Sequence, residues 1–174
     1  MKSIAAFFTI VTFIVPSLFA QLSSTPDTYK TENGVLTVHP INHGTVAFTF
    51  EGKTIIVDPY GGADKFSGLE APDLILISDI HGDHLNSETI SGLATKNTTF
   101  IVPQAVADRM NEELQNQIVV IANEESTTQM GIQVTGVAMY NLPDDENSRH
   151  KKGRGNGYII NFGGKKSLSR CLIK

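Results

Sequence analysis

Four side chains that can bind a metal ion lie within six residues of one another, directly after a short apolar run at 74–77. They are Asp79, His81, Asp83 and His84. Imidazole nitrogens and carboxylate oxygens are the donors that zinc and similar divalent ions take from proteins. One histidine in a loop is usually a polar surface residue. Two histidines and two aspartates interleaved this closely indicate a metal site rather than a solvated loop.

The flanking sequence predicts the elements that must position these residues. The apolar run at 74–77 is typical of a buried strand, so the four polar side chains follow at the end of that strand. Alternation predicts strands over 35–40, 45–50 and 54–57, with a tight turn at 51–53. Beyond the polar loop we expect a helix capped by Asn86 or Ser87. A strand over 98–103, a helix over 104–117 and strands over 118–122 and 130–140 follow. This mixture indicates a layered α/β fold.

Composition narrows the class of protein. A chain of 174 residues fits one domain with a substantial core. A formal net charge of −4 without a long basic run gives no support for nucleic-acid binding. Cys171 is the single cysteine, so an internal disulfide is excluded.

Residues 1–20 have the order of a secretory signal peptide. A lysine at position 2 precedes an apolar stretch at 4–15, and a small residue, Ala20, stands before Gln21. The apolar stretch is short for a membrane span, although an uncleaved anchor is the alternative. We therefore predict an exported protein, periplasmic or secreted, without stable membrane insertion once the signal is removed. Residues 21–33 are polar and predict a flexible lead-in.

Three motifs between about positions 43 and 164 resemble the metallo-β-lactamase fold superfamily. They are His43-Gly44 with the hairpin up to Asp58-Pro59, the metal loop 79–84, similar to H-x-H-x-D-H, and the segment 150–160 before a late strand. The nearest branch is that of metal-dependent hydrolases that includes ascorbate-6-phosphate lactonase-like proteins. The resemblance implies an α/β fold, the αβ/βα sandwich, with 34–166 as a partial domain covering mostly its N-terminal half.

The resemblance also implies a metal-dependent hydrolase that acts on an ester, lactone or phosphoester of a small molecule. Asp79, His81 and His150 would form one metal site, Asp83 and His84 would begin a second, and Asp83 would hold the attacking water as the catalytic base. Zn²⁺ is the expected ion, two per complete site. Asp79 stands where the family has histidine, which widens the choice to Mn²⁺, Fe²⁺ or Mg²⁺.

Several residues keep a second interpretation. Asp79 could orient a ligand instead of binding the metal, and His150 could be a surface histidine in a basic stretch. Asp58 is expected either to hydrogen-bond a metal-bound histidine or to be a turn residue. His39 is expected on a strand surface. The glycine-rich run 153–157 is expected to be a solvated loop, and the alternative is that its basic neighbours help to bind an acidic substrate.

Family members continue beyond the late strand and add a bridging carboxylate and a last histidine. Here an atypical tail, 167–174, ends the sequence. We therefore expect a truncated chain, with a small natural variant as the alternative. Two functions follow: a metal-dependent hydrolase, or a non-catalytic remnant with weak or no metal binding.

Overall fold

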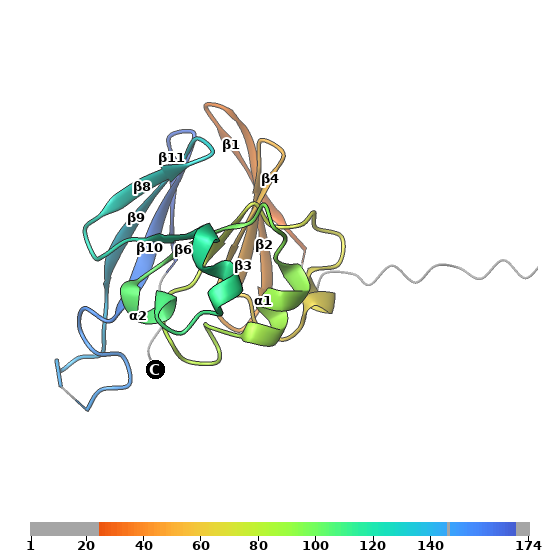
Figure 1. Ribbon diagram of the computed structural model, residues 1–174. Helices are drawn as coiled ribbons and strands as arrows, with labels where there is room; N and C mark the ends of the chain where they lie inside the picture. The colour runs from red at the N-terminus through yellow and green to blue at the C-terminus, as the bar shows by residue number, and fades with distance from the viewer. Residues whose placement is uncertain (1–24, 146, 170–174) are drawn as a thin grey trace, which may run out of the picture.

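The computed structural model describes residues 25–145 and 147–169, which form two β-sheets and several short helices (Figure 1). The predicted signal peptide and Cys171 lie outside the described residues. Among the described residues, no helix has the length and apolar character needed to cross a membrane.

The larger sheet contains seven strands in sequence order. Its strands are β1 (Asp27–Thr31), β2 (Gly34–Asn42), β3 (Thr45–Phe50), β4 (Lys53–Val57), β5 (Leu74–Leu76), β6 (Thr99–Val102) and β7 (Ile118–Val120). The first four pair antiparallel, whereas β4 to β7 pair parallel. Parallel neighbours need crossover connections. These carry the helices η1 (Ala63–Phe66), α1 (Ser87–Leu93), α2 (Gln104–Ala107) and η2 (Glu112–Gln117).

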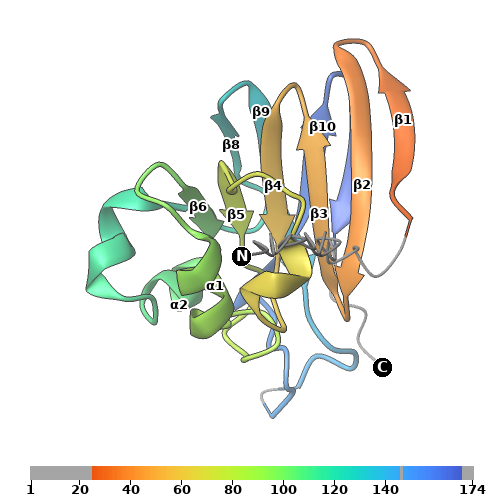
Figure 2. The same cartoon turned by 90° about the vertical axis from the view of Figure 1, so that its right-hand side faces the viewer.

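The smaller sheet is antiparallel throughout, in the order β11-β10-β9-β8. Its strands are β8 (Ser126–Gln129), β9 (Ile132–Met139), β10 (Gly155–Phe162) and β11 (Lys165–Ser169). The smaller sheet lies against one face of the larger sheet in Figures 1 and 2, and the two sheets share an apolar core. Phe48 of β3 and Phe162 of β10 meet there with ring centroids 5.1 Å apart.

Alternation along the strands divides the larger sheet between two cores. Leu74 and Leu76 face the smaller sheet, whereas Ile75 packs with Ile90 of α1 and Val106 of α2. Strand β5 is therefore buried on both sides, in agreement with its continuous apolar sequence. The metal loop follows this central strand, so its first residues start from a fixed backbone.

The structure departs from the sequence predictions at four places. The expected lead-in 21–33 contains β1, whose mostly exposed residues are ordered by backbone pairing with β2 rather than by burial. The helix expected over 104–117 is two short helices, because the backbone of Asn111 between them is not helical, with φ −58° and ψ 144°. The strand expected over 130–140 is one arm of a hairpin with β8. The first residues of the tail extend β11, which pairs with β10.

His39 is also placed differently from the prediction. The side chain expected on a strand surface is buried, and its Nε2 lies 3.3 Å from the Oγ1 of Thr49 on β3. His39 lies directly opposite the fully buried Ala47 of β3, so it shares a covered face of the sheet, which the local sequence alone does not reveal.

Candidate metal centre

A tight turn after β5 folds the metal loop back on itself. The carbonyl of His81 accepts hydrogen bonds from the amides of His84, at 2.9 Å, and Leu85, at 2.8 Å. Asn86 then caps α1, since its Oδ1 accepts the amide of Thr89 at 3.0 Å. The loop is thus fixed by the buried strand before it and by a capped helix after it.

Asp79, His81 and His150 meet at one place. One donor atom from each lies within 4.8 Å of the donor atoms of the other two. His81 Nδ1 is 2.8 Å from Asp79 Oδ1. The rings of His81 and His150 are nearly perpendicular, with centroids 5.1 Å apart. His150 belongs to the connection between β9 and β10, so the site joins residues far apart in sequence.

Three nitrogens at this place have no hydrogen-bond partner among the described residues. They are both ring nitrogens of buried His150 and Nδ1 of His81, whose close approach to Asp79 lacks hydrogen-bond geometry. A buried polar atom without a partner costs about 1–3 kcal/mol. A divalent cation would satisfy these atoms, and two imidazoles with one carboxylate are a donor set that zinc and related ions accept. These residues therefore fit a metal ion.

The rings of His81 and His150 are in the neutral form that binds a metal ion. Burial lowers the pKa of His81 below its ordinary value and outweighs the opposing charge of Asp79. Burial likewise lowers the pKa of His150. Both rings are therefore neutral at pH 7, as metal ligation requires.

His84 is held beside these residues by Asp58. The buried carboxylate of Asp58 lies 2.9 Å from His84 Nδ1, and it accepts the amide of Ser78 at 2.7 Å and the hydroxyl of Ser78 at 2.6 Å. Burial alone would lower the pKa of His84, but the hydrogen bond and charge of Asp58 raise it above its ordinary value. With Nδ1 engaged, Nε2 faces the metal loop and lies 3.8 Å from Asp83 Oδ2. The predicted contact between Asp58 and a histidine of the motif is confirmed.

Asp83 forms the outer side of the centre, with 29% of its side chain exposed. His43 Nε2 lies 3.5 Å and Arg149 Nη2 3.6 Å from its carboxylate. Burial opposes ionisation, but a hydrogen bond from the backbone amide of Asp83 and the charges of His84, Arg149 and His43 lower the pKa of Asp83. This carboxylate is ionised at neutral pH and can accept a hydrogen bond from a water molecule.

The sequence did not predict a role for Arg154. Its Nε and Nη2 each lie 3.2 Å from oxygens of Asp79, whose side chain is fully buried. The available signal was the group of four cationic residues around His150, at 149, 151, 152 and 154. Nothing in the sequence of that group indicates that Arg154 is the member that contacts buried Asp79.

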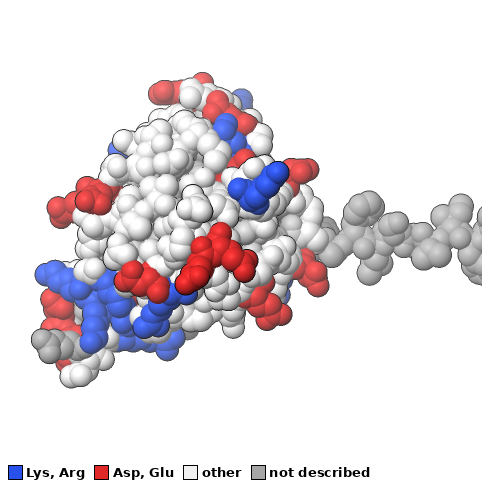
Figure 3. All heavy atoms as spheres, in the orientation of Figure 1, with Lys and Arg blue, Asp and Glu red and all other residues white. Residues whose placement is uncertain are grey.

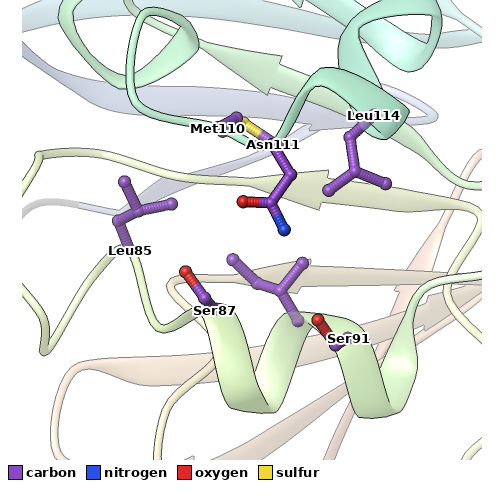
Figure 4. A pocket seen from close by; sticks show the side chains of 7 residues that line it. Leu85, Ser87, Ser91, Met110, Asn111 and Leu114 are labelled. Carbon is purple, nitrogen blue, oxygen red and sulfur yellow. The ribbon is translucent and has the colours of Figure 1, made fainter.

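The structure thus gathers the five predicted ligands in one region, with Asp79, His81 and His150 closest together. The rings of His84 and His150 have centroids 5.9 Å apart. A separate groove between α1 and η2, into which Leu85, Met110 and Leu114 point, is lined by none of these five residues (Figure 4). That the five bind metal stays a prediction.

Comparisons with known proteins agree with this arrangement. Residues 37–167 match the family model described as the beta-lactamase superfamily domain. A UPF0173 metal-dependent hydrolase from Lysinibacillus sphaericus (strain C3-41) is 36% identical over 70 residues, which are 38% of this chain and 30% of that protein. A Parabacteroides distasonis protein named as a metal-dependent hydrolase has a similar crystal structure. It has a TM-score of 0.73 and 27% identity, over 83% of this chain and 64% of that one.

The fold is shared with a protein of different chemistry. CmlA, a diiron beta-hydroxylase from Streptomyces venezuelae, has a TM-score of 0.58 and 21% identity, over 77% of this chain and 29% of that one. This likeness shows the fold alone. The matched regions make up less than two thirds of each of these relatives. Because the family model matches most of the residues from β2 to β11, this chain belongs to the beta-lactamase superfamily, with the metallo-β-lactamase fold.

Proposed function

We propose that this protein is a metal-dependent hydrolase of a small-molecule ester, lactone or phosphoester. The observation that carries the proposal is the meeting of Asp79, His81 and His150, where three buried nitrogens lack hydrogen-bond partners among the described residues. The printed names of the Lysinibacillus sphaericus and Parabacteroides distasonis proteins support the same class of reaction.

Each residue has a role in this proposal. Asp79, His81 and His150 hold one metal ion, and Asp83 and His84 begin a second site. A bound ion would supply a hydroxide at neutral pH and would polarise the substrate oxygen. Asp83 orients the attacking water and takes its proton. Zn²⁺ is the first choice, and the carboxylate of Asp79 also suits Mn²⁺, Fe²⁺ or Mg²⁺.

The second candidate is a non-catalytic chain that binds metal weakly or not at all. The ion pair between Arg154 and Asp79 favours it, because the guanidinium neutralises one expected ligand. Export through residues 1–20 is a separate proposal, which sequencing the N-terminus of the mature protein would test.

Metal content separates the two candidates. Purified protein is stripped with a chelator and titrated with Zn²⁺ by calorimetry, and hydrolysis of generic lactone and phosphodiester substrates is then measured. We expect wild type to bind Zn²⁺ and to be active, and His81→Ala and His150→Ala to lose most of both. His39→Gln, which changes a buried histidine outside the site, is the matched control. Equal Zn²⁺ binding by His81→Ala and wild type would contradict the proposal.

A further inference from the structure

The loop that carries His150 reaches both aspartates of the metal loop through arginines. Arg154 binds Asp79, and Arg149 lies 3.6 Å from Asp83, on the other side of His150 in sequence. Figure 3 shows positively charged side chains gathered at the end of the molecule where the β9–β10 loop lies in Figure 1. Opposite charges thus face each other across the two loops.

The two arginines differ in burial and geometry. Arg154 has 19% of its side chain exposed and contacts both oxygens of Asp79, while Arg149 has 65% exposed and makes a longer contact. Arg154 Nη2 also donates to the backbone carbonyl of Arg149. One guanidinium therefore joins the end of β5 to the residue that directly precedes His150. A planar fork with several donors suits such a double contact.

The rest of the loop is held on both sides of His150. Its amide donates to Oδ1 of Asn141 at 2.9 Å, and its carbonyl accepts the amide of Asn141 at 3.0 Å. On the other side, the amide of Asn156 donates to the carbonyl of Ser78 at 2.9 Å. Between these two attachments, Arg154 is the side chain that ties the loop to Asp79.

We propose that Arg154 is a positioning residue, whose guanidinium fixes the carboxylate of Asp79 and holds His150 against His81. The metal-binding part of this inference rests on the proposed function. The positioning part does not, because it rests on contacts between protein atoms alone. The charge and the geometry of Arg154 act in opposite directions. A positive charge repels a cation, whereas a fixed ligand set favours binding, so the change in affinity shows which effect is larger.

The test compares Arg154→Gln with wild type in two measurements. In metal-free protein, hydrogen exchange at the His150 amide is expected to become at least about tenfold faster, since the loop loses its attachment to Asp79. In calorimetry, Zn²⁺ affinity is expected to fall about 10- to 100-fold, the usual cost of losing a residue that orients a metal ligand. Lys151→Gln removes one charge from an exposed position in the same loop and is expected to change neither value.

Arg154→Lys separates position from charge and covers a failure of Arg154→Gln to fold. An ammonium group keeps the charge but lacks the planar fork, so we expect fast exchange and weak Zn²⁺ binding in this variant too. Unchanged exchange in Arg154→Lys, or Zn²⁺ binding by Arg154→Gln at least as tight as wild type, would overturn the inference. If wild type binds no Zn²⁺, the proposed function fails, and the exchange measurement still decides the role of Arg154.

Discussion

Asp58 organises the interior beside the candidate centre. Its carboxylate accepts hydrogen bonds from the amide and hydroxyl of Ser78 and contacts Nδ1 of His84, while its backbone has a φ of 48°. Asparagine tolerates this left-handed conformation as aspartate does. A change of Asp58 to asparagine therefore alters the side chain without adding backbone strain.

For Asp58→Asn we expect the free energy of unfolding to fall by about 1–3 kcal/mol, because buried donors lose a charged acceptor. Urea denaturation of metal-free protein measures this change. Asp73→Asn is a matched control, since Asp73 accepts the amide of Thr54 at 2.8 Å but lies outside the candidate centre. Zn²⁺ affinity should fall in Asp58→Asn and not in Asp73→Asn. Equal affinities in the two variants would argue against Asp58 as the residue that orients His84.

His39 provides a test of pH dependence away from the centre. Burial lowers the pKa of His39 below its ordinary value of 6.5. As the pH falls through 6.5, the unfolded chain binds a proton that the folded chain resists, so this residue makes stability decrease toward acidic pH. In His39→Gln the loss of unfolding free energy between pH 7.5 and pH 5 should be smaller than in wild type.

Urea denaturation at the two pH values makes this comparison. His81 and His150, whose pKa values are also lowered, act in the same direction in both proteins and cancel in the difference. A variant that loses as much stability as wild type would mean that His39 is protonated equally in both states.

At the level of single residues, some members of the candidate site could be predicted from the sequence and others could not. The motif residues 79–84 were predictable because they are adjacent, and Asp58 because it ends a strand expected beside β5. Arg154 was not, because its partner Asp79 lies 75 positions away and three other cations surround His150. Whether the side chain of Arg154 points inward depends on how the two sheets pack, and no local sequence pattern indicates that packing.

At the scale of elements, β10 approaches the end of β5 closely, and Gly155 permits this. A Cβ at Gly155 would lie 2.7 Å from the carbonyl oxygen of Ser78 and 2.9 Å from Oδ2 of Asp79. Such distances are shorter than van der Waals contact, and one of the atoms belongs to the backbone. The first residue of β10 is therefore restricted to glycine by the metal loop itself.

Gly155→Ala is expected to destabilise the protein by about 1–3 kcal/mol, the usual cost of forcing extra atoms into a packed site. It should also weaken Zn²⁺ binding, because either β10 or Asp79 must move to make room for the added Cβ. Thermal unfolding and calorimetry measure the two effects. Gly44→Ala is the control, since a Cβ there meets no atom within 4 Å. Unchanged Zn²⁺ binding in Gly155→Ala would mean that the centre does not depend on this approach.

Element types followed from the sequence better than element ends did. Alternation and short apolar runs identified β2 to β7, and Asn86 was one of two predicted caps for α1. Strand β1 was missed because its residues are mostly exposed, so no alternation of apolar residues marks it. The helix predicted over 104–117 is interrupted although Met110 and Leu114 both pack toward the core. Apolar spacing alone does not distinguish one long helix from two short ones.

At the scale of the whole molecule, Tyr158 joins the two sheets. It lies on β10, is fully buried, and donates from its hydroxyl toward the carbonyls of Ile77, at 2.7 Å, and Ile101, at 3.2 Å. Layered α/β architecture was predictable from the alternation of strand and helix patterns. The pairing of these two sheets was implied only by resemblance to a family, because contacts between distant segments leave no local signature.

Tyr158→Phe should lower the free energy of unfolding by about 1–2 kcal/mol, since two buried carbonyls lose a donor while the aromatic packing is kept. Chemical denaturation measures the change. Tyr29→Phe, at an exposed position on β1, should be neutral. If the two variants were equally stable, the hydroxyl of Tyr158 would contribute nothing to the attachment of the sheets.

The buried phenol of Tyr158 also gives this protein an ultraviolet absorbance signal that follows its unfolding at alkaline pH. Burial, reinforced by the negative charge of Asp58, raises the pKa of Tyr158 well above 10, and the chain contains four tyrosines and no tryptophan. In an alkaline titration followed by ultraviolet absorbance, the phenolate signal of Tyr158 should therefore be absent until the sheets separate. Stability is lost as the pH rises above 10, because only the unfolded chain releases this proton readily. The late part of the phenolate signal would then report unfolding without any added dye or label.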